Sequence, residues 1–134
     1  METGETIKKG LLRLERYAQN IPGGFHCCAE DPENGYPFAY VSDRFLEILG
    51  WEREEFAARF DNRYTALIHP DDLAAGLRYR NAENSATYAK NGDSIFRILG
   101  KNGYRWVTNA ANQVEWYGKG YIVGTITDIT PYME

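Results

Sequence analysis

A chain of 134 residues is the usual size of one domain and can bury enough surface for one stable core. Hydrophobic residues make up 43% of the chain and charged residues 25%, which excludes a disordered chain. The formal net charge of −4 and the lack of any lysine and arginine cluster argue against nucleic acid as a partner. No uncharged apolar run approaches the roughly 20 residues that cross a bilayer, so we expect no membrane insertion in this segment.

The first part of the chain carries a helical pattern. Across residues 5–20, apolar side chains recur at a spacing of three and four and draw one stripe, made of Ile7, Leu11, Leu14 and Tyr17 or Ala18. The sequence Pro22-Gly23-Gly24 ends this helix. Two short strands are expected at 25–29 and 37–42, and the turn-rich segment between them predicts a hairpin.

The middle of the chain predicts helices. A short helix at 43–49 starts at Ser42 or Asp43 as its cap and ends at Gly50. A second short helix is expected at 53–60. A longer one opens around Pro70, which is tolerated at the first helical position, and we expect it to run to about residue 89.

The last third of the chain changes from a period of about 3.6 residues to a period of 2. This alternation predicts half-buried strands at 94–99, 104–114 and 121–129. The turns between them are short, and short turns join antiparallel neighbours. We therefore expect these three strands to form a meander, in a chain without internal repeats.

Several short motifs, in a fixed order, carry a family signal. They are Tyr40-Val41-Ser42 leading into Phe45-Leu46-Glu47-Ile48-Leu49-Gly50-Trp51, then Arg53-Glu54-Glu55-Phe56, Ile68-His69-Pro70-Asp71-Asp72, Gly100-Lys101-Asn102-Gly103 with Arg105-Trp106-Val107, and Asp128-Ile129-Thr130. Each motif alone is weak. Together they resemble the PAS superfamily, particularly the bacterial type found in front of histidine kinases and diguanylate cyclases, over about residues 21–131.

The resemblance implies an α+β PAS fold, with a five-stranded antiparallel sheet, helices on one face and an N-terminal flanking helix. We expect the flanking helix at 1–20, the sensor domain at 21–131 and, at 132–134, the start of a connector. The effector domain would follow in the same longer chain. Signal output is expected through Asp128, Ile129 and Thr130. Glu52 departs from the family pattern, in which Thr or Ser often caps the next helix, so we expect a less firmly fixed helix start there.

The resemblance also implies a small-molecule pocket between the sheet and the helices. By family position, the pocket-facing candidates are Tyr40, Phe45, Leu49, Trp51, Phe56, Ile68, Phe96, Ile98, Trp106 and Ile126. Plain core packing is the alternative interpretation of each of these residues. An error of one residue along a strand would also reverse the faces.

The sequence His26-Cys27-Cys28 contains residue types that bind zinc or copper. On a strand, however, Cys27 points away from the other two side chains, so the three cannot converge on one ion. We interpret them as packing residues. The adjacent cysteines also make a poor disulfide pair, and reduced thiols fit a cytoplasmic protein.

His69 with Asp71 and Asp72 has the composition of a general base or a ligand cluster. Pro70 favours a different role, in which the histidine and the two carboxylates cap and start a helix. We adopt that second interpretation. The sequence therefore predicts no catalytic and no metal-ligating residues, and a domain without enzymatic activity of its own.

Two cofactors found in PAS relatives can be compared with this chain. Members that form a light-driven flavin adduct use a reactive cysteine on a helix of the middle region, where this chain has none. Haem-binding members often supply an axial histidine from the long helix before the third strand, and residues 73–89 contain none. Both observations argue against these cofactors. His26 and His69 remain as other haem ligands, and the cofactor stays unassigned.

The N-terminal stripe of Ile7, Leu11, Leu14 and Ala18 has two interpretations. It can cover the outer face of its own sheet, or it can pair with the same helix of a second chain, and we favour a homodimer. The sequence thus predicts a sensory module that binds a small molecule, dimerises, or does both, to regulate a C-terminal histidine kinase or diguanylate cyclase. The alternative is a ligand-free module for protein interaction and dimerisation.

Overall fold

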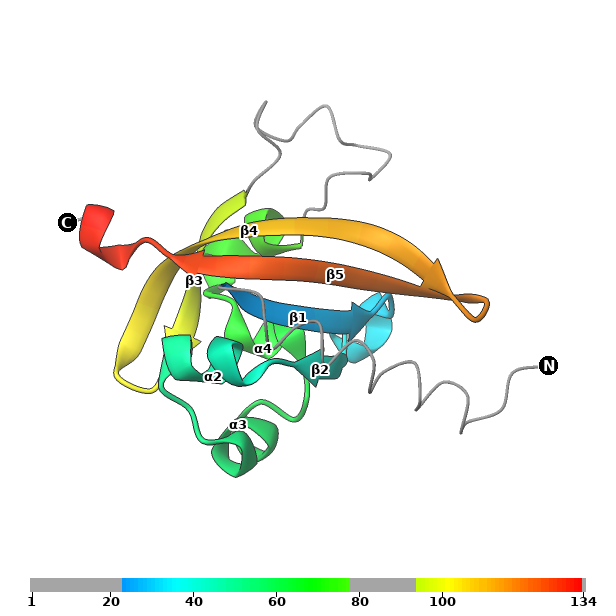
Figure 1. The fold of residues 1–134 in the computed structure, drawn as a ribbon, viewed down its shortest axis with the longest axis horizontal. Coiled ribbons are helices and arrows are strands. Elements are labelled where there is room, and N and C mark those ends of the chain that lie inside the picture. Colours follow the sequence, from blue (N-terminus) through cyan, green and yellow to red (C-terminus); the bar gives the residue numbers. More distant parts are fainter. Residues whose placement is uncertain (1–22, 78–93, 134) are drawn as a thin grey trace.

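The computed structural model describes residues 23–77 and 94–133, and this part of the chain forms a five-stranded sheet with helices against one face (Figure 1). The strands are β1 (Gly24–Ala29), β2 (Phe38–Val41), β3 (Ser94–Gly100), β4 (Gly103–Trp116) and β5 (Lys119–Asp128). The helices are α2 (Asp43–Leu49), α3 (Arg53–Arg59), α4 (Tyr64–Leu67) and α5 (Leu73–Gly76), and the 3-10 turns are η1 (Pro32–Asn34), η2 (Pro70–Asp72) and η4 (Thr130–Tyr132). The α+β fold and its antiparallel sheet are as predicted. The flanking helix expected at 1–20 lies outside the described residues.

The strands follow the order β2-β1-β5-β4-β3, and every neighbouring pair is antiparallel. The predicted β1–β2 hairpin and the β3–β4–β5 meander are both confirmed. The last strand, β5, inserts between β1 and β4 and so joins the two halves of the sheet. The β4–β5 hairpin extends past the end of β1, and η4 lies at the opposite end of the sheet from the hairpin tip (Figure 1).

Helix α2 is capped by Ser42, which settles the choice between the two predicted caps. The Ser42 Oγ accepts a hydrogen bond from the Phe45 backbone N–H at 3.2 Å and another from the Phe25 N–H at 3.0 Å. The side chain therefore caps the helix and ties its start to β1. Gly50 follows the last helical residue, and its φ of +81° lies in the left-handed region that glycine adopts without strain.

Helix α3 shows how the unusual Glu52 is accommodated. The backbone N–H of Glu52 donates to the Glu55 side chain at 3.3 Å, so a carboxylate one turn into the helix satisfies the start of the helix. Lys101 holds the same carboxylate at 2.9 Å. The start of α3 therefore keeps the capping contact that a carboxylate at the third helical position provides, although Glu52 stands where family members often carry Thr or Ser.

Helix α5 is shorter than predicted. It ends at Gly76, and Leu77 leaves helical geometry with φ −100° and ψ 5°. A side chain at position 76 would lie 2.7 Å from the Ile68 Cδ1 atom, so the chain turns where its backbone packs closely on Ile68. The rest of the predicted helix, up to residue 89, falls largely outside the described residues.

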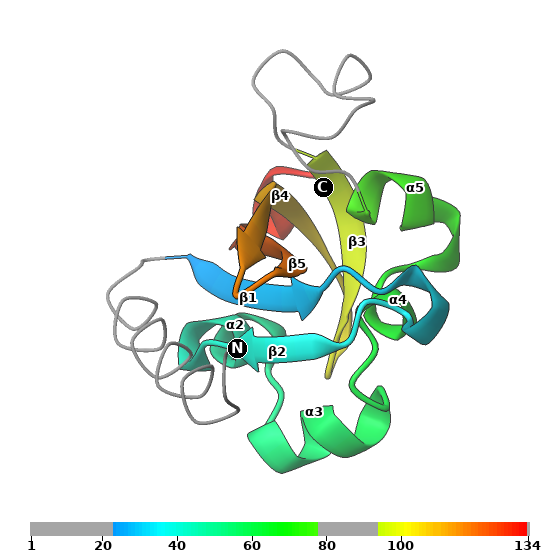
Figure 2. The ribbon, with the colours of Figure 1, turned by 90° about the vertical axis from the view of Figure 1, so that its right-hand side faces the viewer.

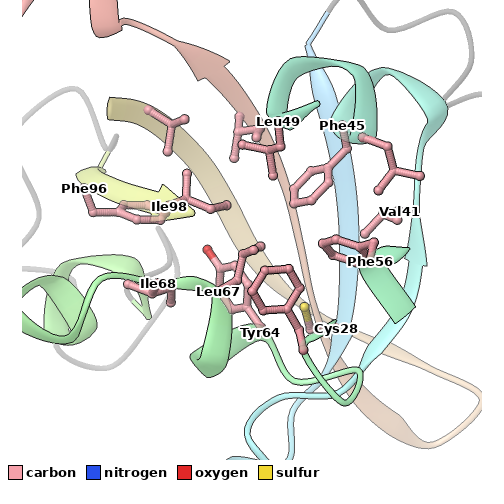
Figure 3. Packing of buried hydrophobic residues seen from close by; sticks show 14 residues of the cluster. Cys28, Val41, Phe45, Leu49, Phe56, Tyr64, Leu67, Ile68, Phe96 and Ile98 are labelled. Atoms are coloured by element: carbon pink, nitrogen blue, oxygen red, sulfur yellow. The ribbon is translucent and has the colours of Figure 1, made fainter. Parts of the chain in front are cut away.

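The main core lies between the inner face of the sheet and the helices, which line one side of the strands in Figure 2. Its side chains meet from both layers, as Figure 3 shows. The buried members are Cys28, Val41, Phe45, Leu46, Leu49, Phe56, Phe60, Tyr64, Leu67, Ile68, Phe96, Ile98, Val107 and Ile126. A smaller cluster on the outer face contains Phe25, Cys27 and Tyr40. Alternation along the strands separates these two clusters.

Candidate functional site

The inner face of the sheet and the helices α2 to α5 enclose the space in which the sequence predicts a pocket; we call this space the cup. Most of the predicted pocket residues lie in its core, namely Phe45, Leu49, Phe56, Ile68, Phe96, Ile98 and Ile126. Trp51 packs at the margin, where its indole N–H donates to the Leu99 carbonyl at 3.0 Å. These side chains are therefore in position to contact a molecule within the cup, and at the same time they fill it.

Two predicted pocket residues lie on the other face of the sheet. Tyr40 pairs with Cys27 across β2 and β1 and belongs to the outer cluster. Trp106 pairs with Arg97 across β4 and β3, while its neighbour Val107 is fully buried in the cup. The predicted positions of Tyr40 and Trp106 were wrong. Both errors are shifts of one residue in strand parity, which move a side chain to the opposite face.

A small polar cluster stands inside the apolar cup. His26 is fully buried, and its Nε2 lies 3.0 Å from Asn109 Oδ1. A carbonyl oxygen only accepts, so Nε2 carries the proton and Nδ1 is left as an acceptor. The Cys28 Sγ lies 4.0 Å from that Nδ1, at the distance of a weak thiol hydrogen bond. Cys27 belongs to the outer cluster, which confirms that the three residues do not converge on one ion.

The electrostatics of this cluster keep it uncharged. Burial lowers the pKa of His26 to about 4, and the hydrogen bond to Asn109 only partly opposes that shift. Burial also raises the pKa of the Cys28 thiol well above its ordinary value, with a further contribution from Cys27. At neutral pH the cluster is a neutral imidazole, an amide and a thiol. Such groups can orient a polar ligand atom, but the thiol is a poor nucleophile.

Close packing around His26 depends on a glycine. A methyl group at Gly124 would lie 2.8 Å from His26 Nε2 and 2.7 Å from Asn109 Oδ1, which leaves no room for one. The Tyr64 ring stacks on the imidazole with centroids 5.2 Å apart, and the Phe45 ring meets its edge at 5.7 Å. The histidine is thus held by the sheet on one side and by α2 and α4 on the other.

The free space in the cup is small. A cavity of about 10 Å³ lies beside the polar cluster, lined by Cys28, Tyr36, Tyr64, Gly76, Leu77, Asn109 and Ile122. That volume holds about one water molecule. Within the described residues, the cup is therefore filled by its own side chains.

The His69 corner has the structural role that the sequence favoured. His69 Nδ1 accepts from the Asp71 backbone N–H at 3.1 Å and caps η2. The sequence did not reveal the role of Asp72, which binds the Arg97 guanidinium with Oδ2 at 2.8 Å and Oδ1 at 3.0 Å. Those hydrogen bonds hold the pKa of Asp72 below its ordinary value. His69 therefore caps η2, and its neighbour Asp72 joins η2 to β3 through an ion pair.

The predicted output segment is fastened to β4. Asp128 Oδ2 accepts from the Arg105 guanidinium at 2.7 and 3.0 Å, and Asp128 Oδ1 accepts from the Thr130 N–H at 2.9 Å. The Trp106 N–H donates to Thr130 Oγ1 at 2.9 Å, and the Ile129 N–H donates to the Trp106 carbonyl at 2.8 Å. Both polar side chains of this motif, those of Asp128 and Thr130, therefore have a hydrogen-bond partner on β4.

Sequence reasoning missed Asn109, a member of the polar cluster, and Gly124, which leaves room for the cluster. Neither is part of a recognisable motif, and their partner His26 lies far away in the sequence. The only available signal was the alternation of β4, which places Asn109 two residues from Val107 and on the same face. A polar residue on the buried face of a strand calls for a hydrogen-bond partner in the core.

Comparison with known proteins agrees with this architecture. A family model described as PAS fold matches residues 38–126, which is more than half of the chain. No curated protein matches. Solved structures similar to this chain include a PAS domain from a two-component sensor histidine kinase, with a TM-score of 0.62 and 13% identity over 91% of this chain and 98% of that chain.

Two further solved structures support the same fold. A sensory box histidine kinase/response regulator from Burkholderia thailandensis E264 has a TM-score of 0.54 and 24% identity over 90% of this chain and 87% of that chain. An RNA-binding light-oxygen-voltage receptor has a TM-score of 0.61 and 16% identity; the match covers 98% of this chain but 36% of the receptor. The match of the family model and the shared architecture show that the chain belongs to the PAS fold family.

Proposed function

We propose that this chain is a sensory module of a bacterial signal-transduction protein and regulates an effector domain in the same longer chain. The attachment of Ile129 and Thr130 to the backbone of Trp106 on β4 is the observation that supports this proposal most. The same strand lines the cup with Val107 and Asn109. A change of packing inside the cup therefore acts on the strand from which the C-terminal turn is held.

The mechanism is a shift between two packings of the cup. A ligand or a partner that binds one packing more tightly raises its population, and a ligand with equal affinity for both shifts nothing. The hydrogen bonds of Asp128 and Thr130 report that shift to the effector. A histidine kinase is the effector we propose first, because two of the similar solved structures carry that name. A diguanylate cyclase is the other class.

What the module senses has two candidates. The first is a small molecule bound in the cup among residues such as Phe45, Phe96 and Ile126. The second is a ligand-free interaction and dimerisation module, and the cavity of about 10 Å³ favours it, because small-molecule sites usually measure about 300 to 1,000 Å³. A ligand larger than a water molecule would have to displace side chains around this cavity, which Gly76 and Leu77 border.

Homodimerisation remains part of the proposal. The proposed interface, Ile7, Leu11, Leu14 and Ala18, lies outside the described residues. Among the described residues, no helix has both the length and the apolar character to cross a membrane. We place the module in the cytoplasm, in keeping with its two buried free cysteines, and propose that it has no catalytic activity of its own.

Native mass spectrometry of the freshly purified protein, with the denatured mass as control, tests both candidates. Extra mass that disappears on denaturation supports a small-molecule sensor. A ligand-free dimer supports the interaction module. A ligand-free monomer over the concentration range of the measurement contradicts both the small-molecule sensor and the dimerisation module.

A further inference from the structure

Besides the attachment described above, a second set of contacts leads to the C-terminal turn, and it starts on the helical side of the cup. We propose that Asp72, Arg97 and Trp106 form a positioning relay, through which the corner made by η2 and α5 sets the conformation of the Thr130 turn. This inference rests on the proposed function, because it names residues through which that output is regulated. Each contact in the relay joins described residues.

The first step joins the corner to the edge strand β3. Asp72 receives three hydrogen bonds from one residue: two from the Arg97 guanidinium, at 2.8 and 3.0 Å, and one from the Arg97 backbone N–H at 2.9 Å. The Arg97 carbonyl in turn accepts from the His69 N–H at 3.0 Å. Both the backbone and the side chain of Arg97 therefore follow the position of η2. The two-pronged geometry fixes direction as well as distance.

The same corner lines the free space of the cup. Asp72 directly precedes α5, whose last residue, Gly76, packs against Ile68 so closely that a methyl group would lie 2.7 Å from the Ile68 Cδ1. Gly76 and Leu77 border the cavity of about 10 Å³. A group larger than this cavity would displace α5, because a close-packed interior transmits strain. The carboxylate of Asp72 moves with the start of the helix.

The second step crosses from the edge of the sheet to its outer face. Arg97 and Trp106 are cross-strand partners, and the guanidinium carbon lies 5.0 Å from the centre of the indole ring. One planar guanidinium thus holds a carboxylate and an aromatic face at once. If Asp72 moves away, the Arg97 guanidinium loses the hydrogen bonds that orient it, and its stacking on the Trp106 ring is weakened.

The third step leads from Trp106 to the output turn. Its backbone N–H donates to Thr130 Oγ1 at 2.9 Å, and its carbonyl accepts from the Ile129 N–H at 2.8 Å. Arg105 reaches the same turn from the neighbouring position, through Asp128. The turn is therefore held by two adjacent residues of β4: Arg105, whose ion pair stays within the sheet, and Trp106, which is linked to the helical corner.

Amide hydrogen exchange, followed by NMR on the 134-residue chain, tests the relay. The variant Asp72→Asn weakens the grip on Arg97, and we expect the Ile129 N–H to exchange at least about fivefold faster relative to the amides of the β1–β5 ladder. Lys101→Met is the matched control. It removes an ion pair with Glu55 that also joins a helix to this end of the sheet, at 2.9 Å, and should leave the Ile129 amide unchanged.

A double-mutant cycle shows whether Trp106 carries the effect. Trp106→Leu removes the ring and keeps both backbone hydrogen bonds of the residue, so in that background Asp72→Asn should change the exchange of Ile129 by less than about twofold. Equal acceleration of all amides, an unchanged Ile129 amide, or additive effects in the cycle would each overturn the relay. The experiment needs no ligand, dimer or effector, so its result is independent of the mass measurement that tests the proposed function.

Discussion

The inner face of the sheet and its β3 edge hold their polar groups in different ways. Inside the cup, His26 and Asn109 are buried and neutral, and close packing holds them in place. At the edge, Asp72, Arg97 and Trp106 are partly buried, and an ion pair and stacking hold them. Full burial favours neutral groups, because a buried charge without a partner is expensive, whereas the partly buried edge keeps charged groups that are paired and hydrogen-bonded. The interior therefore sets stability, and the edge is free to respond.

The largest expected effect lies in the interior. Phe45 is fully buried between α2 and the sheet, so Phe45→Ala should lower the free energy of unfolding by about 3 to 5 kcal/mol. Urea denaturation measures this change. Trp106→Ala, on the outer face, should cost clearly less. A larger loss for Trp106 than for Phe45 would contradict the assignment of the two faces.

The neutral state of buried His26 predicts that the free energy of unfolding falls as the pH drops below about 6.5. Folded His26 has a pKa of about 4 and the ordinary value is 6.5, so between these values the unfolded chain binds more protons. The stabilisation is complete above about pH 6.5 and is lost as the pH falls toward 4. From pH 7 to pH 5 the free energy of unfolding should fall by about 2 kcal/mol.

The variant His26→Gln isolates this contribution. It keeps an uncharged polar group in the cup, so its unfolding free energy should change much less between pH 7 and pH 5, although it starts from a lower value. Asp72 and Asp128 have lowered pKa values and contribute below that range. Chemical denaturation at each pH is the measurement, and equal slopes for the two proteins would refute a neutral buried histidine.

A methyl group at Gly124 tests how tightly the interior is packed. Gly124→Ala places a carbon against His26 and Asn109, and forced repacking of this kind costs about 1 to 3 kcal/mol. Gly120→Ala, on the same strand, is the control, because the nearest atom there is the end of the Glu30 side chain and can move away. Thermal unfolding should separate the two variants. Similar melting temperatures would mean that the cup is loosely packed.

The smallest expected effect lies at the surface. Lys101 and Glu55 form an ion pair at 2.9 Å, and both side chains are more than a third exposed. Lys101→Met should therefore change the denaturation midpoint little at low salt and not measurably at high salt, where screening removes most of the attraction. A large effect that persists in high salt would show that the edge contributes to stability as the interior does.

Alternation predicted β3 well and β4 badly, for a physical reason. In β3, the apolar residues Phe96 and Ile98 both face the cup, so large side chains mark the buried face. In β4, the large aromatic side chain of Trp106 lies on the outer face and stacks on Arg97, while the smaller Val107 faces the cup. Size indicates burial only where no partner on the outer face covers the aromatic ring.

The polar cluster could not be derived from local pattern, because its members come from distant strands. His26 meets Asn109 across β5, which lies between their strands, and only Gly124 at that crossing leaves room for the contact. The same limit applies to Asp72 and Arg97, whose pairing depends on how η2 meets the edge of β3. Motifs and turns predicted the order of the elements; the contacts that join them required the fold.

The central position of β5 governs how the chain folds. Gly24, at the start of β1, pairs with Ile126 near the end of β5, so the first strand gains its main neighbour only when almost the whole domain is available. Closing a loop of that length costs entropy before any contact compensates for it, which slows folding. During synthesis, β1 and β2 therefore lack β5 as a neighbour. A two-stranded ribbon of this kind is marginally stable on its own, and its exposed edge can pair with other chains. A ribosome that stalls shortly before residue 119 would leave that ribbon unpaired.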